Sequence, residues 1–204
     1  MDLPLTKRAQ RKAATREAVL NAARKVFLDR GYEGATIAAI AEAAGVSPGT
    51  VLNASPSKIA LLNAIMREDF ETLGADCEAL SASLAGGTRE RVMTLLEQHL
   101  TRHFANLDLM SAVFGHCWLG ETEVLEELED NMAMAWQPVL NLLNQAHQTE
   151  ELSAGVEPQT LIHAMQDVYL GVLRAAIAKK HDMFASSDIL RSRIALLFDP
   201  VLAR

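Results

Sequence analysis

Small and polar side chains between Gly45 and Lys58, in the stretch GVSPGTVLNASPSK, have types and a spacing suited to reading DNA. Glycine accepts the positive φ that a tight turn between two helices requires. A serine can then cap a helix that has proline at its first position, where the missing N–H costs little. Side chains of this size fit against base edges and thymine methyl groups in a major groove. The sequence therefore predicts a DNA-reading helix whose outward residues are Ser47, Pro48, Gly49, Thr50 and Asn53.

Basic residues are concentrated near the start of the chain. Residues 1–58 hold nine Lys and Arg against five Asp and Glu, a net charge of +4, whereas the remaining residues hold ten against twenty-one, a net charge of −11. A basic head on an acidic body suggests that only the head meets a polyanion, and the alternative is chance segregation on a solvated surface. A basic arm at the start of the first helix can grip phosphates or enter the minor groove, or it can be a disordered, solvated terminus. The arm consists of Lys7, Arg8, Arg11 and Lys12.

A second group of side chains lies between residues 99 and 136 and mixes apolar with polar chemistry. An apolar cavity with a few polar points is what a small-molecule site requires, and methionines suit an adaptable wall. The sequence therefore predicts an effector pocket here, and an ordinary hydrophobic core is the alternative. The predicted lining residues are His99, His103, Phe104, Met110, Phe114, Cys117, Trp118, Met132 and Trp136.

Metal and catalytic chemistry receive less support. His99 and His103 are four residues apart on one predicted helix face, with His116 and Cys117 further along, and such a set can bind zinc. No HExxH or CxxC spacing accompanies it, and no nucleophile elbow or phosphate-binding loop is present. We therefore predict no metal, no cofactor, no catalytic residue and no enzyme activity.

Helices alone are expected to position these residues. Apolar residues recur at i, i+3 and i+4, and no segment alternates with period two, so the sequence predicts an all-α fold of about nine helices. Pro138 is expected to kink the seventh helix near Ala135. Eight of the helices are predicted at about residues 7–30, 36–44, 57–84, 88–106, 107–119, 121–148, 158–181 and 186–203. The third in order begins at about residue 47.

Two domains follow from this order: a helix-turn-helix DNA-binding domain at 1–58, and an effector-binding and dimerisation domain at 59–204, linked by the fourth helix from about residue 57. One head places one helix in a groove, and a palindrome needs two, about one helical turn (~34 Å) apart. Apolar stripes on the last two helices can form a homodimer interface, or they can fill the monomer core. The residues predicted at the interface are Leu161, Met165, Tyr169, Val172, Ile194 and Phe198.

The cellular compartment is expected to be the cytoplasm. No run reaches ~18 apolar residues, so no transmembrane helix and no membrane partner are expected. The N-terminus lacks the apolar core of a signal peptide. Two cysteines, Cys77 and Cys117, give no disulfide framework, which favours a reducing environment.

The stretch TREAVLNAARKVFLDRGYEGATIAAIAEAAGVSPGT, followed by PSKIALLNAIM, resembles the N-terminal domain of the TetR/AcrR transcriptional regulators. The resemblance covers about residues 15–66, and its A-x-x-x-F…G-Y…T-x-x-x-I-A…A-G-V-S-x-G-T…P-S-K spacing is specific. It implies a ligand-responsive transcriptional repressor that binds a palindromic operator on double-stranded DNA as a homodimer. It implies release by a small apolar effector, and contacts of Thr36 and Lys58 with the DNA backbone.

The chain departs from the family pattern at the end of the reading helix, where GTVLNASPSK replaces a sequence close to GTLYRHFPSK. Leu52 stands where a tyrosine often binds a phosphate, Ala54 replaces a common histidine or tyrosine, and Ser55 replaces a core phenylalanine. Losing a phosphate contact weakens affinity without changing sequence preference. We expect Leu52 to pack and Asn53 to hydrogen-bond to a base or a phosphate. The alternative function is a non-DNA-binding sensor or scaffold dimer with a degenerate helix-turn-helix.

Overall fold

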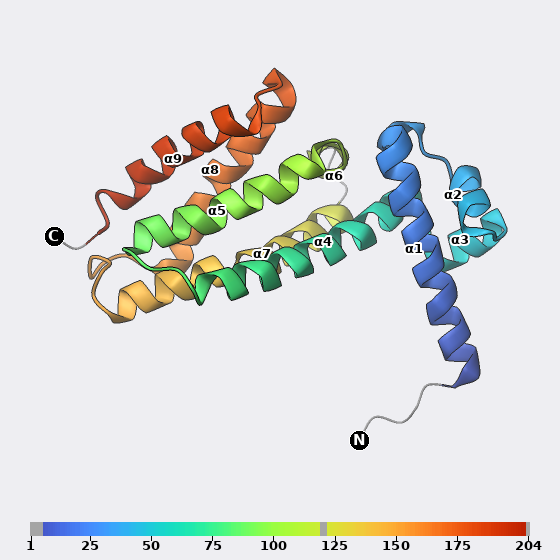
Figure 1. Cartoon of the computed structure of the whole chain (residues 1–204), viewed down its shortest axis with the longest axis horizontal. Helices are drawn as coiled ribbons and strands as arrows, with labels where there is room; N and C mark the ends of the chain where they lie inside the picture. Colours follow the sequence, from blue (N-terminus) through green and yellow to red (C-terminus); the bar gives the residue numbers. More distant parts are fainter. Residues whose placement is uncertain (1–5, 119–121, 203–204) are drawn as a thin grey trace. The chain divides into compact units, whose positions relative to one another are not determined.

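Nine helices make up the fold in the part of the chain that the structure describes (Figure 1). The structure is a computed structural model that describes residues 6–118 and 122–202. These residues form no strand, and one isolated bridge joins Leu152 and Leu202. The predicted all-α fold is confirmed. The helices are α1 (Lys7–Gly34), α2 (Ile37–Ala44), α3 (Pro48–Ala54), α4 (Lys58–Ser81), α5 (Thr88–Ala105), α6 (Leu107–Trp118), α7 (Thr122–Gln148), α8 (Pro158–Lys179) and α9 (Met183–Phe198).

Side-chain caps set the starts of the short helices. The hydroxyl of Thr36 accepts the backbone N–H of Ala39 at 3.1 Å, and the hydroxyl of Ser47 accepts that of Thr50 at 3.1 Å. Each cap satisfies an N–H group that has no partner inside the first helical turn. The serine cap was predicted from the sequence and is confirmed.

The last helix begins earlier than the sequence predicted. The carboxylate of Asp182 accepts the backbone N–H of Ala185 at 2.8 Å, which starts α9 at Met183. The apolar spacing alone placed the start at residue 186, because it records the buried stripe and misses the first turn.

The chain divides into two compact units. The N-terminal unit comprises residues 1–69 and 108–129, and the C-terminal unit comprises residues 70–107 and 130–204. The division falls inside α4 and inside α7. The N-terminal unit thus holds α6 in addition to the first three helices. The predicted domain boundary after residue 58 stays a prediction.

The core of the N-terminal unit is built by α1, α2 and α3, which lie side by side in Figure 1. Phe27, Ile40 and Val51 contribute fully buried side chains from the three helices. The guanidinium of Arg24 in α1 donates to Asp69 at 2.8 Å and is also paired with a neighbouring glutamate of α4. This ion pair, which is partly buried, fastens the first half of α4 to α1.

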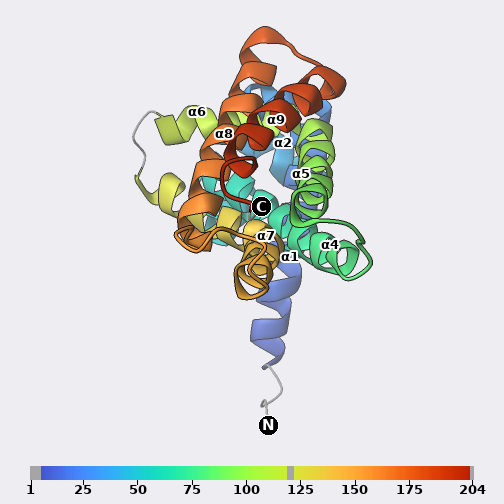
Figure 2. The same cartoon turned by 90° about the vertical axis from the view of Figure 1, so that its left-hand side faces the viewer.

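The C-terminal unit packs α8 along α9, with α5 on α9 as well (Figures 1 and 2). All six residues predicted at the dimer interface are buried inside this single chain, with 0–7% of each side chain exposed. Side chains with so little exposed area cannot contact a partner subunit, so the interface assignment is corrected. The stripes fill the core of the C-terminal unit. The corrected residues are Leu161, Met165, Tyr169, Val172, Ile194 and Phe198.

Among the described residues, the longest helices lie in both units, and none resembles a membrane span. α7 runs as one helix of 27 residues with Pro138 inside it. Within residues 6–118 and 122–202, no helix is both long enough and apolar enough to cross a membrane.

Candidate nucleic-acid interface

A tight turn centred on Gly45 joins α2 to α3. Gly45 has φ 66° and ψ 31°, a left-handed conformation that glycine adopts without a steric penalty. The backbone N–H of Val46 donates to the carbonyl of Ala41 at 3.0 Å and closes the turn. Ile40 of α2 and Val51 of α3 are fully buried on the inner sides of the two helices. This arrangement is the helix-turn-helix that the sequence predicted.

The predicted reading residues lie on or beside the outer face of α3. Ser47, Pro48, Gly49 and Asn53 are exposed, and Thr50 is half-buried. The hydroxyl oxygens of Ser47 and Thr50 are 2.9 Å apart and share a hydrogen bond. The structure therefore brings these residues to one surface, although two of the hydroxyls are engaged with each other.

Leu52 joins this outer face, which the sequence reasoning missed. Its side chain is 46% exposed, so Leu52 packs only in part. The signal was present in the spacing, because Leu52 follows Pro48 by four residues and must share its helix face. Ser55 is the buried residue instead, at 7% exposed, and its backbone N–H donates to Val51 at 2.9 Å.

Lys58 does structural work at the start of α4. Its ammonium donates to the carbonyls of Tyr32 at 2.9 Å and Ala35 at 3.3 Å, and it lies 4.2 Å from the centre of the Tyr32 ring. Two of its three N–H donors are thus used inside the protein. Lys58 fastens α4 to the connection between α1 and α2, a role that the sequence reasoning missed.

The remaining predicted contacts are accessible. Thr36 is exposed, although its hydroxyl caps α2. The basic arm forms the first turns of α1, so the described part of the arm is helical, and its members Lys7, Arg8, Arg11 and Lys12 are all exposed.

The N-terminal segment of the chain matches a known family. Residues 19–65 match the family described as bacterial regulatory proteins, tetR family. The matched segment contains the whole helix-turn-helix and Lys58. The similarity to the tetR family thus lies in this N-terminal segment.

Two relatives and one solved structure extend this comparison. Over 57 residues it is 42% identical to the HTH-type transcriptional regulator UidR of Escherichia coli, covering 28% of this chain and 29% of UidR. Over 124 residues it is 29% identical to the HTH-type transcriptional repressor KstR of Mycolicibacterium smegmatis, covering 57% of this chain and 60% of KstR. The alignments thus span less than two thirds of either relative.

Thermus thermophilus FadR, a TetR family transcriptional repressor in complex with lauroyl-CoA, matches the structure with a TM-score of 0.75 at 21% identity. The match covers 93% of this chain and 96% of FadR. At this level of identity, the likeness shows that the two proteins share a fold.

Three of the nine predicted pocket residues form a packed cluster in the C-terminal unit. The ring centres of His99 and Trp136 are 5.3 Å apart, and both rings meet Tyr169 edge to face. Nδ1 of His103 lies 2.7 Å from the hydroxyl of Tyr169, at hydrogen-bond distance. All four side chains are buried. Of the two histidines that the sequence assigned to an effector, His103 therefore already has a hydrogen-bond partner inside the core.

Burial keeps both histidines uncharged. Desolvation, followed by the charge of the neighbouring His103, lowers the pKa of His99 from 6.5 to about 3. Desolvation and then Arg102 lower the pKa of His103 to about 4. A backbone contact with Ala135 acts in the opposite direction on His99, but neither of its ring nitrogens reaches hydrogen-bond geometry with any described residue. His99 therefore retains unused hydrogen-bonding capacity in an apolar environment.

The other predicted pocket residues are divided between the two units, apart from two whose side chains are not described. Phe104 and Met132 belong to the C-terminal unit and are half-buried. Met110 and Phe114 belong to the N-terminal unit and are buried. The side chains of Cys117 and Trp118 lie outside the described part of the chain.

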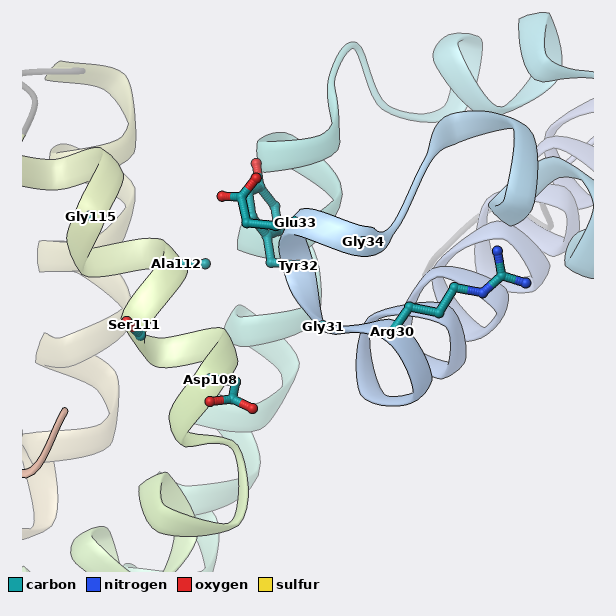
Figure 3. Close-up of a pocket in the computed structure, with 9 residues that line it drawn as sticks. All are labelled: Arg30, Gly31, Tyr32, Glu33, Gly34, Asp108, Ser111, Ala112 and Gly115. Atoms are coloured by element: carbon teal, nitrogen blue, oxygen red, sulfur yellow. The ribbon is translucent and has the colours of Figure 1, made fainter. Parts of the chain in front are cut away.

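A hollow of about 440 Å³ lies in the N-terminal unit between the end of α1 and α6. Figure 3 shows Tyr32 and Glu33 on one side of it, Ser111 and Ala112 on the other, and the side chain of Arg30 directed away from α6. None of the predicted pocket residues whose side chains the structure describes lines this hollow.

A second hollow, also about 440 Å³, lies in the C-terminal unit among α4, α5 and α9. Leu80, Leu100 and Phe184 supply apolar wall, and Glu97 supplies a carboxylate. None of the predicted pocket residues with a described side chain lines it either. Among the side chains that the structure describes, no group of three or more His, Cys, Asp or Glu is placed to hold a metal ion.

Proposed function

We propose that this protein is a transcriptional repressor that binds a palindromic operator as a homodimer and leaves it when a small apolar effector binds. The observation that carries the proposal is the helix-turn-helix of the N-terminal unit, in which Gly45 sets the turn and the small and polar side of α3 is exposed. Such a protein acts by binding and not by catalysis, and it acts in the cytoplasm, where bacterial DNA lies.

Charge supports a contact with DNA by the head. Residues 1–58 carry a net charge of +4, and the basic arm is exposed. Phosphate contacts fix the position of a protein on the duplex and supply much of its affinity. We assign this role to Arg11 and Lys12, and a backbone contact to Thr36 at the N-terminus of α2, where a helix favours an anion.

Binding to a palindrome requires a homodimer, because one head places only one reading helix in a groove. The reading helix of the second head must lie about one helical turn (~34 Å) away. Since the predicted stripes are buried, we place the interface on exposed apolar side chains of α9. Five large apolar side chains are well exposed among the described residues, and three of them lie on α9: Met183, Phe184 and Leu196. Apolar side chains gathered on one exposed element mark an interaction surface.

The effector is proposed to reach the cluster around His99. A buried imidazole with two unsatisfied nitrogens gains a hydrogen bond when a ligand supplies a polar group, while Trp136 and Tyr169 suit an apolar body. Half-buried Phe104 and Met132 are the proposed remaining wall. Because T. thermophilus FadR, which shares the fold, is described in complex with lauroyl-CoA, an acyl-CoA, whose acyl chain would supply the apolar part, is the first class to test.

Selection of bound duplexes from a random pool, followed by affinity measurements at several salt concentrations, tests this function. We expect a palindrome to be selected, and the logarithm of affinity to fall by about 0.9 per phosphate contact for each unit of log salt. Lauroyl-CoA is expected to lower affinity about 5- to 150-fold, the usual range for coupled sites. If the folded protein binds no duplex at low ionic strength, the head is degenerate and the protein is a sensor or scaffold.

A further inference from the structure

The outward face of α3 presents an exposed leucine. Leu52 is 46% exposed and follows Pro48 by four residues and Gly49 by three, so the three positions share one helix face. α3 has seven residues, and none of them is charged. The Arg and Lys side chains that most often read guanine are therefore absent from this helix.

The hydroxyl groups at the start of α3 are engaged with each other. Ser47 accepts the backbone N–H of Thr50 at 3.1 Å and shares a hydrogen bond with its hydroxyl at 2.9 Å. Among the polar side chains of this face, the amide of Asn53 is exposed. An asparagine amide pairs with adenine, whose partner thymine presents a methyl group in the same groove. The chemistry of the face thus favours A·T base pairs.

Gly49 lets DNA come close to this face. A Cβ atom at Gly49 would meet only the hydroxyl oxygen of Ser47, at 3.8 Å, and open space otherwise. With no side chain at this position, a base edge can approach the backbone between Pro48 and Leu52. The apolar side chain of Leu52 then stands at the rim of the open space.

A single exposed leucine is ordinary on a protein surface. Leu52 differs because it shares the reading face with an apolar proline and an open glycine, and the helix carries no charge. We infer that Leu52 is a specificity-determining residue that packs against the C5 methyl group of a thymine in the major groove. This inference rests on the proposed function and names the base that one side chain of the same site reads.

The test replaces the thymines of the selected duplex by uracil, one position at a time. Uracil lacks only the C5 methyl group and keeps every hydrogen-bonding group of thymine. We expect one position in each half-site to lower the affinity of the wild-type protein about fourfold, the ratio that corresponds to burying one methyl-sized group. Leu52→Ala is expected to bind the thymine and uracil duplexes equally well. The matched control is Leu28→Ala, which truncates another exposed leucine, 56% exposed in α1, and is expected to keep the fourfold ratio.

The outcomes separate this inference from DNA binding itself. If the wild-type protein is indifferent to every uracil, or if Leu52→Ala keeps the fourfold ratio, Leu52 reads no methyl group while the repressor function stands. If the wild-type protein binds no duplex, the proposed function and the inference fall together. Should Leu52→Ala unfold, Leu52→Asn, which keeps the size and loses the apolar surface, is the second variant, with the same expected loss of the ratio.

Discussion

Gly49 separates the needs of the fold from those of DNA binding. Its position faces open space and its φ is helical, so Gly49→Ala is expected to leave the free energy of unfolding unchanged or to raise it by up to about 1 kcal/mol. The added methyl group obstructs the approach of a base edge, so operator affinity is expected to fall about tenfold, the order of one lost base contact. Thermal unfolding and duplex titration measure the two effects.

The control for this prediction is Gly45→Ala. Gly45 has φ 66°, where a side chain costs about 1–2 kcal/mol, so this variant is expected to be less stable. Both positions have room for a methyl group, and only the backbone conformation distinguishes them. A Gly49→Ala protein that binds the operator as well as the wild type would place the DNA on another surface.

The buried histidines predict how stability changes with pH. His99 and His103 have pKa values of about 3 and 4 in the folded state, below the ordinary 6.5, so the unfolded chain binds more protons between these values. The neutral rings therefore contribute stability fully above pH 6.5, and that contribution is lost as the pH falls towards the folded pKa values. The loss is up to roughly 1.4 kcal/mol per pH unit for each histidine.

Urea unfolding at pH 7 and pH 5 checks this effect. His99→Phe is expected to lose less stability between the two pH values than the wild type, because one titrating ring is gone. His163→Gln is the control, because His163 is exposed, and it should keep the wild-type difference. Equal losses in His99→Phe and wild type would show that His99 is accessible to protons in the folded protein.

At the scale of the helix, local signals were sufficient where the cause is local. Gly45 and Ser47 each act on neighbours within a few residues, so the sequence predicted the turn and the serine cap correctly. Stripes of apolar residues on α8 and α9 showed which sides of the helices are buried. An apolar stripe does not show which element packs against it, and here other helices of the same chain do so.

The candidate effector site shows the same limit. The spacing of His99 and His103 placed them on one helix face, and both do contact aromatic rings. Whether such a face meets a cavity or a core depends on Trp136 and Tyr169, which come from α7 and α8. The exposure of Leu52 was missed for a similar reason, since it depends on how α3 lies against α1 and α2.

Lys58 joins two helices, and its substitution distinguishes a structural tie from a phosphate contact. Lys58→Met removes two charge-assisted hydrogen bonds to the carbonyls of Tyr32 and Ala35. We expect the free energy of unfolding to fall by about 1.5–3 kcal/mol, while the salt dependence of DNA binding keeps its slope. Arg11→Gln changes an exposed residue and should show the reverse. We expect unchanged stability and a slope of log affinity against log salt that is reduced by about 0.9, the value for one phosphate contact. A Lys58→Met protein with full stability and a shallower slope would make Lys58 a phosphate ligand.

The whole molecule needs two reading helices, and α9 carries the surface proposed to join them. Leu196 is 72% exposed on α9, so Leu196→Glu leaves the monomer core intact and places a charge on the proposed interface. Burying an unpaired charge is unfavourable, so sedimentation velocity is expected to show monomers. Operator affinity should then fall steeply, because each head binds without the help of the second.

Leu28→Glu places the same charge on another exposed leucine, at 56% exposure in α1, and is expected to remain dimeric. Both variants should unfold at the wild-type temperature when compared at low protein concentration, since neither side chain belongs to a core. If Leu196→Glu sediments as a dimer and binds the operator normally, the two subunits meet through another face, and the exposed apolar side chains of α9 serve a different partner.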